Sequence, residues 1–313
     1  MKKFLNIFFV LTFIFSFCQQ NSAQATLSTK KPNLSAIGFH KRSELPPEMQ
    51  IRKLFENYQK YTNSQDINKL LNLYSNEFKN NDGYDKTRLK ELATEAWKEL
   101  PNVKYTLSVL SVDVDIDNAR VLVSERLSGL TKTPTENIEG SGYIDSESMS
   151  VYYLKRFSNE WLITSDFIIC EKTAMRFGTA KYIPMNIDAP SIISSGEEYT
   201  AVVKIDIPEQ YIGIVSISNE PISRNITKTN EVFRGVKSHG IRERILTSNK
   251  EDRNENAIAS VGIVKPSIKE DTIDIDITGI AYLSTRVNVI NHKLQTQLEN
   301  KSTQQTTIES NKK

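Results

Sequence analysis

Apolar residues recur at three- and four-residue steps in the first third of the chain, which is the spacing of one helix face. The first predicted helix carries Ile51, Leu54, Phe55, Tyr58 and Tyr61 on this face. A second helix, capped by Ser64 or Asp66 and predicted to end near Phe78, carries Ile67, Leu70, Leu71 and Tyr74. A third is predicted from Lys86 to Leu100, because Pro101 cannot continue a helix.

Alternating apolar and polar residues replace the helical spacing after Pro101. YTLSVLSVDVDI and ARVLVSERLSGL predict two strands around a turn at Asp117 and Asn118, and GSGYID leads into a hairpin over VYYLKRFSNEWLITSD, residues 151–166. A two-residue turn at Ser158 and Asn159 would place Phe157 opposite Glu160. The predicted core-facing side then holds Tyr152, Leu154, Arg156, Trp161, Ile163 and Ser165. The predicted half-exposed side holds Val151, Tyr153, Lys155, Leu162, Thr164 and Asp166.

Helices followed by a run of strands predict an α+β fold over residues 49–178, with three helices packed on one face of an antiparallel sheet. From 186 to 290 only short strands between turn signals follow, which predicts a small all-β sandwich domain. Residues 220–256 are polar and predict no element. Residues 291–313 are Gln, Thr, Ser, Asn and Lys for the most part, a composition typical of a disordered polar tail. Each of the two domains is expected to fold alone.

The N-terminus has the pattern of a secretory signal peptide, residues 1–25. Lys2 and Lys3 precede an apolar run that ends at Phe17, and small residues follow before Ala25, where cleavage is expected. The run is too short for a comfortable membrane span. Residues 26–48, polar and with three prolines, predict a linker. The mature protein is therefore expected to be exported, periplasmic or extracellular, with no transmembrane span; a form anchored by lipid at Cys18 is the alternative.

Charge and composition exclude some partners and chemistries. The 313 residues carry a net charge of +2 and have no basic run with interleaved aromatics, so nucleic acid is not an expected partner. Asp113, Asp115 and Asp117 have the spacing of a calcium loop, but Asn118 replaces the glycine that such a loop needs, so a solvated strand face is favoured. The three histidines are scattered, and neither a metal site nor a cofactor is predicted. Cys170 is expected to be a buried apolar residue.

Residues 49–178 resemble the nuclear transport factor 2-like superfamily, which includes polyketide-cyclase-like and ketosteroid-isomerase-like proteins. The resemblance is carried by IRKLFENYQKYTNSQDINKLLNLYSNEF, the NNDG turn, EAWKELP, NARVLVSE and the hairpin with its Trp-x-Ile close. It implies a cone whose helices and sheet enclose a pocket, and it specifies a scaffold rather than an activity. The part after residue 186 only loosely resembles an immunoglobulin-like sandwich.

Aromatic residues of the predicted cone are the candidate pocket lining, although each of them is also suited to a packed core. The candidate ligand-binding residues are Tyr58, Tyr74, Phe78, Trp97, Tyr152 and Trp161. Residues 49–178 contain no His, and the carboxylates that match no catalytic motif are Glu77, Asp82, Glu125 and Asp166. Catalytic residues therefore stay unassigned.

Two functions remain open from the sequence. The first is a non-catalytic binding or assembly module of the cell envelope, with a small apolar ligand or an envelope protein as its partner. The second is a small-molecule enzyme of the isomerase, dehydratase or hydrolase type, which would use a pocket Tyr with an Asp or Glu. Whether the chain forms a homodimer also stays open.

Overall fold

The computed structural model describes residues 45–131, 138, 140–222, 232–236, 240–269 and 272–291. The predicted signal peptide, residues 26–44 of the predicted linker and residues 292–313 of the predicted tail lie outside these ranges. Within the described ranges, no helix is long and apolar enough to span a membrane.

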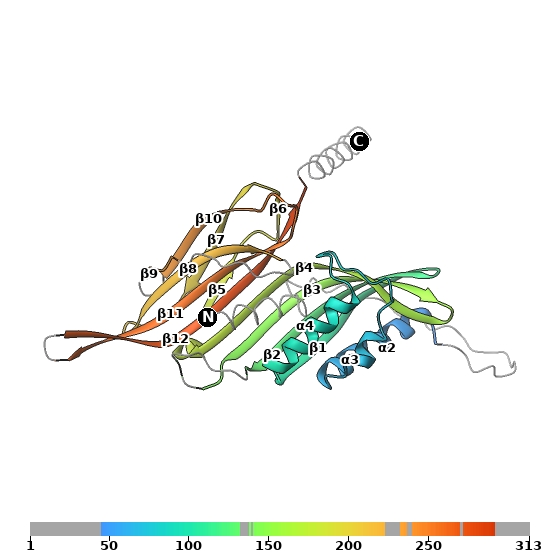
Figure 1. Cartoon of the computed structure of the whole chain (residues 1–313), viewed down its shortest axis with the longest axis horizontal. Coiled ribbons are helices and arrows are strands. Elements are labelled where there is room, and N and C mark those ends of the chain that lie inside the picture. Colours follow the sequence, from blue (N-terminus) through green and yellow to red (C-terminus); the bar gives the residue numbers. More distant parts are fainter. Residues whose placement is uncertain are drawn as a thin grey trace, which may run out of the picture.

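Three helices lie on one face of a long sheet, as Figure 1 shows. They are α2 (Pro47–Asn63), α3 (Ile67–Leu71) and α4 (Lys86–Glu99). The side chains of Asp66 and Asp85 cap α3 and α4 by accepting hydrogen bonds from backbone N–H groups. The apolar stripe predicted for α2 is buried: Ile51, Leu54, Phe55 and Tyr58 all belong to one core cluster with residues of the sheet.

The second helix is shorter than predicted, and it ends at Leu71 rather than near Phe78. Beyond it the chain becomes extended and pairs with the sheet. Tyr74 forms a bridge with Ile163, and the Ser75 N–H donates to the Ile163 carbonyl at 2.9 Å. Tyr74 and Phe78 are both buried, but the backbone at these residues is not helical. Their helical spacing in the sequence was therefore misleading.

The long sheet contains strands from both ends of the described chain. Its first four strands form the predicted antiparallel meander: β1 (Asn102–Asp115), β2 (Asn118–Leu130), β3 (Tyr143–Phe157) and β4 (Glu160–Gly178). The sheet then continues through β12 (Thr272–Ile290), β11 (Glu255–Lys269), β8 (Ile212–Pro221) and β9 (Arg234–Val236). A short strand, β6 (Ile192–Ser194), pairs in parallel with β12.

A second sheet of three strands has the order β10-β7-β5. These strands are β5 (Met185–Asp188), β7 (Glu198–Ile205) and β10 (Gly240–Thr247), and the 3₁₀ turn Thr179–Tyr182 precedes them. Val203 and Ile205 of this sheet share a core with Ala259, Val261 and Leu283 of the long sheet. Both β9 and β10 lie in the stretch 220–256, where the sequence pattern predicted no element.

The long sheet crosses the predicted domain boundary without a break. Residues Lys172–Gly178 of β4 pair with Gly279–Thr285 of β12, while the same part of β4 also pairs with β3. Residues up to 178 are called the N-terminal half below, and residues from 185 the C-terminal half. The domain limits 49–178 and 186–290 stay predictions. The two segments nevertheless share backbone hydrogen bonds. The alternation of residues within one strand does not reveal which other strand it pairs with.

The hairpin has the predicted turn, with Phe157 opposite Glu160. A β-bulge between Tyr153 and Leu154 then shifts the register, so that Tyr152 lies opposite Asp166 and Tyr153 opposite Ser165. Asp166 is therefore buried on the core side, and the sequence-based assignment of Asp166 and Ser165 to their faces was wrong. A prediction that assumes strict alternation of side chains between the two faces cannot anticipate the extra residue of a β-bulge.

Candidate functional site

A line of buried polar side chains crosses the helix-covered face of the long sheet. The register places Glu125 opposite Ser148, and Ser148 opposite Glu171. The pairing of β4 with β12 ends at Lys172 and Thr285, and the next positions along the two strands are Glu171 and Arg286. The line, called the polar row below, consists of Glu125, Ser148, Glu171, Arg286, Asn256 and Glu220, all buried. It runs from the N-terminal half into the C-terminal half.

Glu125 lies in the middle of the apolar core of the N-terminal half. On β2 it follows Val121 and Val123 in the core-facing phase, and it is 2% exposed. Oε1 accepts hydrogen bonds from the hydroxyls of Tyr105 at 2.6 Å and Tyr152 at 2.9 Å. Oε2 accepts one from Ser150 at 3.1 Å. Burial raises the pKa of Glu125 to about 7, although these hydroxyls act in the opposite direction by stabilising the carboxylate.

The tyrosine rings around Glu125 pack on one another. Tyr58 lies 5.9 Å from the ring centre of Tyr105 and 6.1 Å from that of Tyr152. The Tyr74 hydroxyl donates to the Tyr58 hydroxyl at 3.2 Å, and Tyr74 is 4.7 Å from Phe78, ring centre to ring centre. Burial raises the pKa of Tyr58 and Tyr74, so both stay protonated in the ordinary pH range.

The six residues predicted to line a pocket are thus members of the core or its margin. Tyr58, Tyr74, Phe78, Tyr152 and Trp161 are buried, and Trp97 packs partly buried against the same cluster. Four of them form the ring contacts around Glu125, whereas Trp97 and Trp161 lie elsewhere in this core. Their role in ligand binding stays a prediction.

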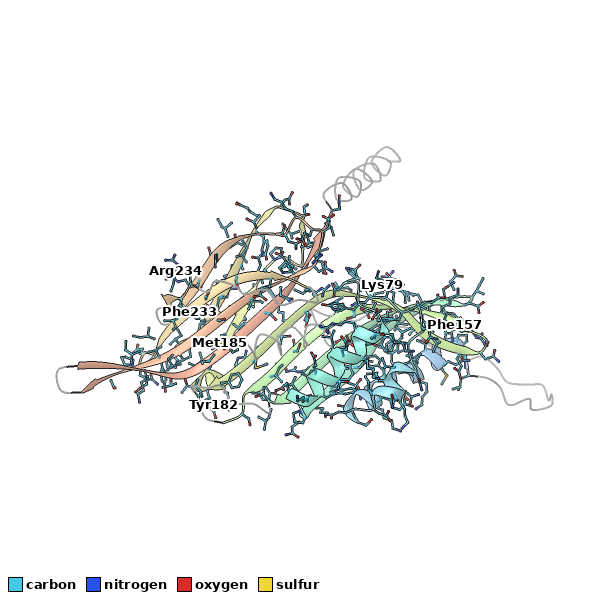
Figure 2. The ribbon with its side chains drawn as sticks, viewed as in Figure 1. Lys79, Phe157, Tyr182, Met185, Phe233 and Arg234 are labelled. Carbon is cyan, nitrogen blue, oxygen red and sulfur yellow. The ribbon has the colours of Figure 1, made fainter. Side chains whose placement is uncertain are left out.

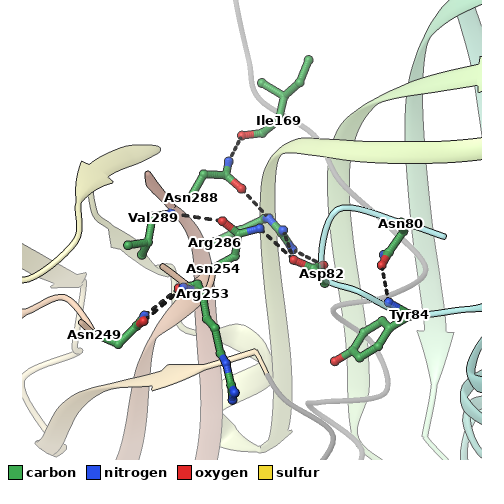
Figure 3. Close-up of polar contacts among 10 residues, drawn as sticks. All are labelled: Asn80, Asp82, Tyr84, Ile169, Asn249, Arg253, Asn254, Arg286, Asn288 and Val289. Carbon is green, nitrogen blue, oxygen red and sulfur yellow. Dashed lines mark hydrogen bonds and ion pairs between the residues drawn. The ribbon is translucent and has the colours of Figure 1, made fainter. Parts of the chain in front are cut away.

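The two halves are joined by a buried ion pair next to the polar row (Figure 3). Arg286 on β12 donates to Asp82, with Nη2 2.6 Å from Oδ1 and Nη1 3.1 Å from Oδ2. Asp82 belongs to the NNDG turn before α4. The arginine Nε also donates to Asn288 Oδ1, and the Asn288 amide donates to the Ile169 carbonyl of β4. Asn254 adds a third donor to Asp82 at 2.8 Å.

Two further carboxyl groups lie near Arg286. Burial, then the charges of Asp82 and Glu125, raise the pKa of Asp166 to about 7, although Arg286 acts against the rise. Glu171 is 1% exposed, and burial raises its pKa well above the ordinary value. The neighbouring Thr173 hydroxyl is engaged with Ser146 at 2.6 Å, and within the described residues neither oxygen of Glu171 receives a hydrogen bond of ordinary geometry. The guanidinium of Arg286 is therefore surrounded by more buried carboxyl groups than the protein can keep ionised.

Sequence reasoning named Asp82, Glu125 and Asp166 as carboxylates without a motif, and the structure brings them to one region; Glu77 is exposed. It missed Tyr105, Ser150, Glu171 and Arg286. One signal was available for Glu125, because it occupies the core-facing phase of an otherwise apolar strand. No such signal existed for Arg286, whose partner lies 204 residues away.

Two hollows lined by described residues lie on the C-terminal half. One, of about 220 Å³, is lined by Val215, Ile217, Val232, Arg234, Arg242, Glu243 and Arg244. The other, of about 480 Å³, is lined by Pro184, Met185, Asn186, Lys204, Ile205, Asp206, Gly240 and Ile241.

No protein-family model matches the chain, and no curated protein matches it in sequence. Solved structures similar to it include a type 2 hexachlorocyclohexane dehydrochlorinase, 13% identical, with 39% of this chain and 84% of that chain covered and a TM-score of 0.33. A type 3 dehydrochlorinase from Novosphingobium barchaimii is 12% identical, with 39% and 85% covered and a TM-score of 0.33. A protein of the NTF2-like family from Streptomyces avermitilis is 15% identical, with 39% and 94% covered and a TM-score of 0.30.

These matches agree with the NTF2-like resemblance noted from the sequence, for a segment of about 39% of the chain. At such identities the likeness concerns the fold alone. Since one fold supports many activities, function has to be argued from the side chains.

Proposed function

We propose that this protein is an exported, non-catalytic binding or assembly module of the cell envelope. In this proposal the three-helix cone is a framework, and the sandwich-like C-terminal half presents the binding surface. The observation that carries the proposal is the state of Glu125. Both of its oxygens are engaged by hydroxyls of the fold itself, from Tyr105, Tyr152 and Ser150. A carboxyl held in this way stabilises its surroundings and has little acceptor capacity left for a substrate.

Two hollows lined by described residues also support a binding role outside the cone. The aromatic rings around Glu125 contact one another at 4.7 to 6.2 Å between centres, whereas the two hollows described above lie on the C-terminal half. A ligand reaching those hollows would not have to displace packed aromatic side chains. Export is supported by the sequence pattern of residues 1–25 alone.

One observation favours a second candidate, an enzyme that moves a proton. A carboxyl group with a pKa of about 7 beside tyrosine hydroxyls has the properties of a general acid or base at neutral pH. In this alternative Glu125 would transfer the proton, and Tyr105 or Tyr152 would stabilise the charge that develops on a small substrate. The alternative requires a substrate to reach Glu125.

The two candidates differ in whether Glu125 can abstract a proton from a small molecule. 5-Nitrobenzisoxazole is a suitable probe, because its ring opens when a base removes one proton, and the product absorbs visible light. We expect the purified protein and its Glu125→Gln variant to open the ring at the same rate at pH 8. A rate that exceeds the variant's by about a hundred-fold or more, the low end of what a positioned base contributes, would establish the enzyme instead.

Export has its own test. Mass spectrometry of the protein recovered from the envelope fraction of its host should give a chain that begins at Thr26. A chain beginning at Cys18 with attached lipid would replace cleavage after Ala25 by membrane anchoring. Retention of Met1 would contradict export.

A further inference from the structure

The smaller hollow lies where the edges of the two sheets approach each other in the C-terminal half. Strand β9 is the last strand of the long sheet, and β10 is the outer strand of the short sheet. Arg234 begins β9 opposite Val215, while Arg242 and Arg244 are two residues apart on β10, so they point to the same side of that strand. Figure 2 shows Arg234 and the adjacent Phe233 at the margin of this half, away from the helices.

The fold positions two of the three guanidinium groups. Arg242 donates to the Gly235 carbonyl at 2.6 Å, and Arg244 donates to the Ile217 carbonyl. Both arginines therefore reach from the short sheet to the long one, and their stems are held in place. Each guanidinium has five N–H donors, so most of them remain available after one such bond. The backbone of Arg234 pairs with Val215, whereas its side chain makes no hydrogen bond to another described residue.

Among the described residues, no ion pair neutralises the positive charge of this hollow. None of Arg234, Arg242 and Arg244 forms an ion pair with a carboxylate within the described residues, and the lining contains a single acid, Glu243. Next to these groups, Val215, Ile217 and Val232 provide an apolar surface. Three guanidinium groups of like charge repel one another, and such an arrangement is typically stabilised by a bound anion.

We propose that this hollow is a binding site for an oxyanion that carries a small apolar group. The guanidinium groups would bind the oxyanion through paired N–H donors, and the apolar group would contact Val215, Ile217 and Val232. Because three cations face one anion, a dianion such as a phosphomonoester suits the site better than a monoanion. The volume of about 220 Å³ limits the ligand to the size of a single aromatic ring with its charged group. This inference rests on the proposed binding function, for which it names the ligand class and the site.

Isothermal titration calorimetry with four probes tests the chemistry on the full-length protein. The probes are phenyl phosphate, benzoate, inorganic phosphate and benzyl alcohol. We expect phenyl phosphate to bind with a Kd of about 1 mM or tighter, more strongly than benzoate or inorganic phosphate, and benzyl alcohol not to bind. Binding should weaken as NaCl is raised, because salt screens the exposed guanidinium groups. Absence of phenyl phosphate binding, or equal binding of benzyl alcohol, would overturn the proposal.

Variants locate the site. Arg234→Gln should weaken phenyl phosphate binding about ten-fold, since one charged hydrogen-bond donor is lost. Its side chain holds no other described contact, so the fold is expected to survive; Arg244→Gln should weaken binding similarly, but it also loses the bond to β8. Arg120→Gln on β2 removes the same charge from an exposed strand position and is the matched control. Equal binding by the Arg234→Gln and Arg120→Gln variants would contradict the assignment of the site.

The outcome is separable from that of the proposed function. If phenyl phosphate does not bind and Glu125 abstracts no proton from 5-nitrobenzisoxazole, the anion site is wrong and the non-catalytic role stands. If Glu125 does abstract the proton while phenyl phosphate binds at Arg234, the non-catalytic role is wrong and the anion site stands.

Discussion

Asp82 and Arg286, 204 positions apart in the chain, form an ion pair of 2.6 Å with side chains that are 2% and 0% exposed. The aspartate belongs to the turn that leads into α4, and the arginine to the strand that extends the long sheet. Taking two charges out of water is costly, so such a pair is weak evidence of net stabilisation. Removing one partner, however, leaves an uncompensated charge in the interior.

The first prediction concerns this pair. Arg286→Met should lower the free energy of unfolding by about 3 to 5 kcal/mol, because Asp82 would remain buried without its counter-charge. The double variant Asp82→Leu/Arg286→Met should recover much of the loss, since neither charge is left. Urea melts of the full-length protein measure all three forms.

The control for Arg286 is Arg126, whose side chain is 53% exposed and pairs with Asp145 and Glu147 on the surface. Arg126→Met should change stability by less than about 1 kcal/mol. A similar loss for Arg126→Met and Arg286→Met would mean that the buried pair has no special role at the junction.

The second prediction is that the two halves unfold together. The sequence pattern led us to expect independent folding of residues 49–178 and 186–290, but β4 and β12 share a ladder, and Asp82 and Arg286 share an ion pair. Both tryptophans, Trp97 and Trp161, lie in the N-terminal half, so their fluorescence reports on that half alone. Hydrogen exchange at the β11 amides reports on the other.

We expect both probes to give one midpoint in urea. Two separate transitions, together with a folded 49–178 fragment of parental stability, would restore the original expectation of independent domains.

The third prediction returns to the hairpin. Trp161 is buried in the core of the N-terminal half, so Trp161→Ala should cost about 3 to 5 kcal/mol. Lys155, on the exposed side of the same hairpin, lies with its Nζ 5.8 Å from the ring centre of Phe157, which is itself exposed. Lys155→Ala should therefore change stability by less than about 0.5 kcal/mol. Near-parental stability of Trp161→Ala would show that its ring is not part of the packed core.

Local patterns were sufficient for the first and third helices and for most of the meander from β1 to β4. The apolar stripe of α2, the cap at Asp66 and the turn between Phe157 and Glu160 follow from residues close in sequence. These features depend on periodicity and on short turns, which a single chain reveals directly.

The features that decide the site depend on distant partners. The bulge at Tyr153 moves Asp166 into the core, and the pairing of β4 with β12 brings Arg286 to Asp82. Neither the bulge nor the pairing of β4 with β12 leaves a periodic signal in the sequence. Glu125 was visible as an acid in an apolar strand, but its three hydroxyl partners come from β1 and β3, so only the register of the sheet identifies them.

The last prediction tests the claim that Glu125 is a structural group of a closed core. Its pKa of about 7 in the folded protein exceeds the ordinary 4.5, so the folded state binds this proton more tightly than the unfolded state does. The resulting stability is fully present below pH 4.5 and is lost as the pH rises through about 7. A rise of this size corresponds to about 3 kcal/mol. Glutamine resembles the protonated carboxyl and cannot ionise.

The most direct measurement is the free energy of unfolding of the full-length protein and of Glu125→Gln between pH 4.5 and pH 8, with the exposed Glu160→Gln as control. Relative to the parent, Glu125→Gln should gain about 3 kcal/mol across this range and be at least as stable at pH 8, while Glu160→Gln follows the parent. Parallel curves for the parent and Glu125→Gln would contradict the account, because they would mean that Glu125 keeps its ordinary pKa and is hydrated rather than enclosed in a packed core.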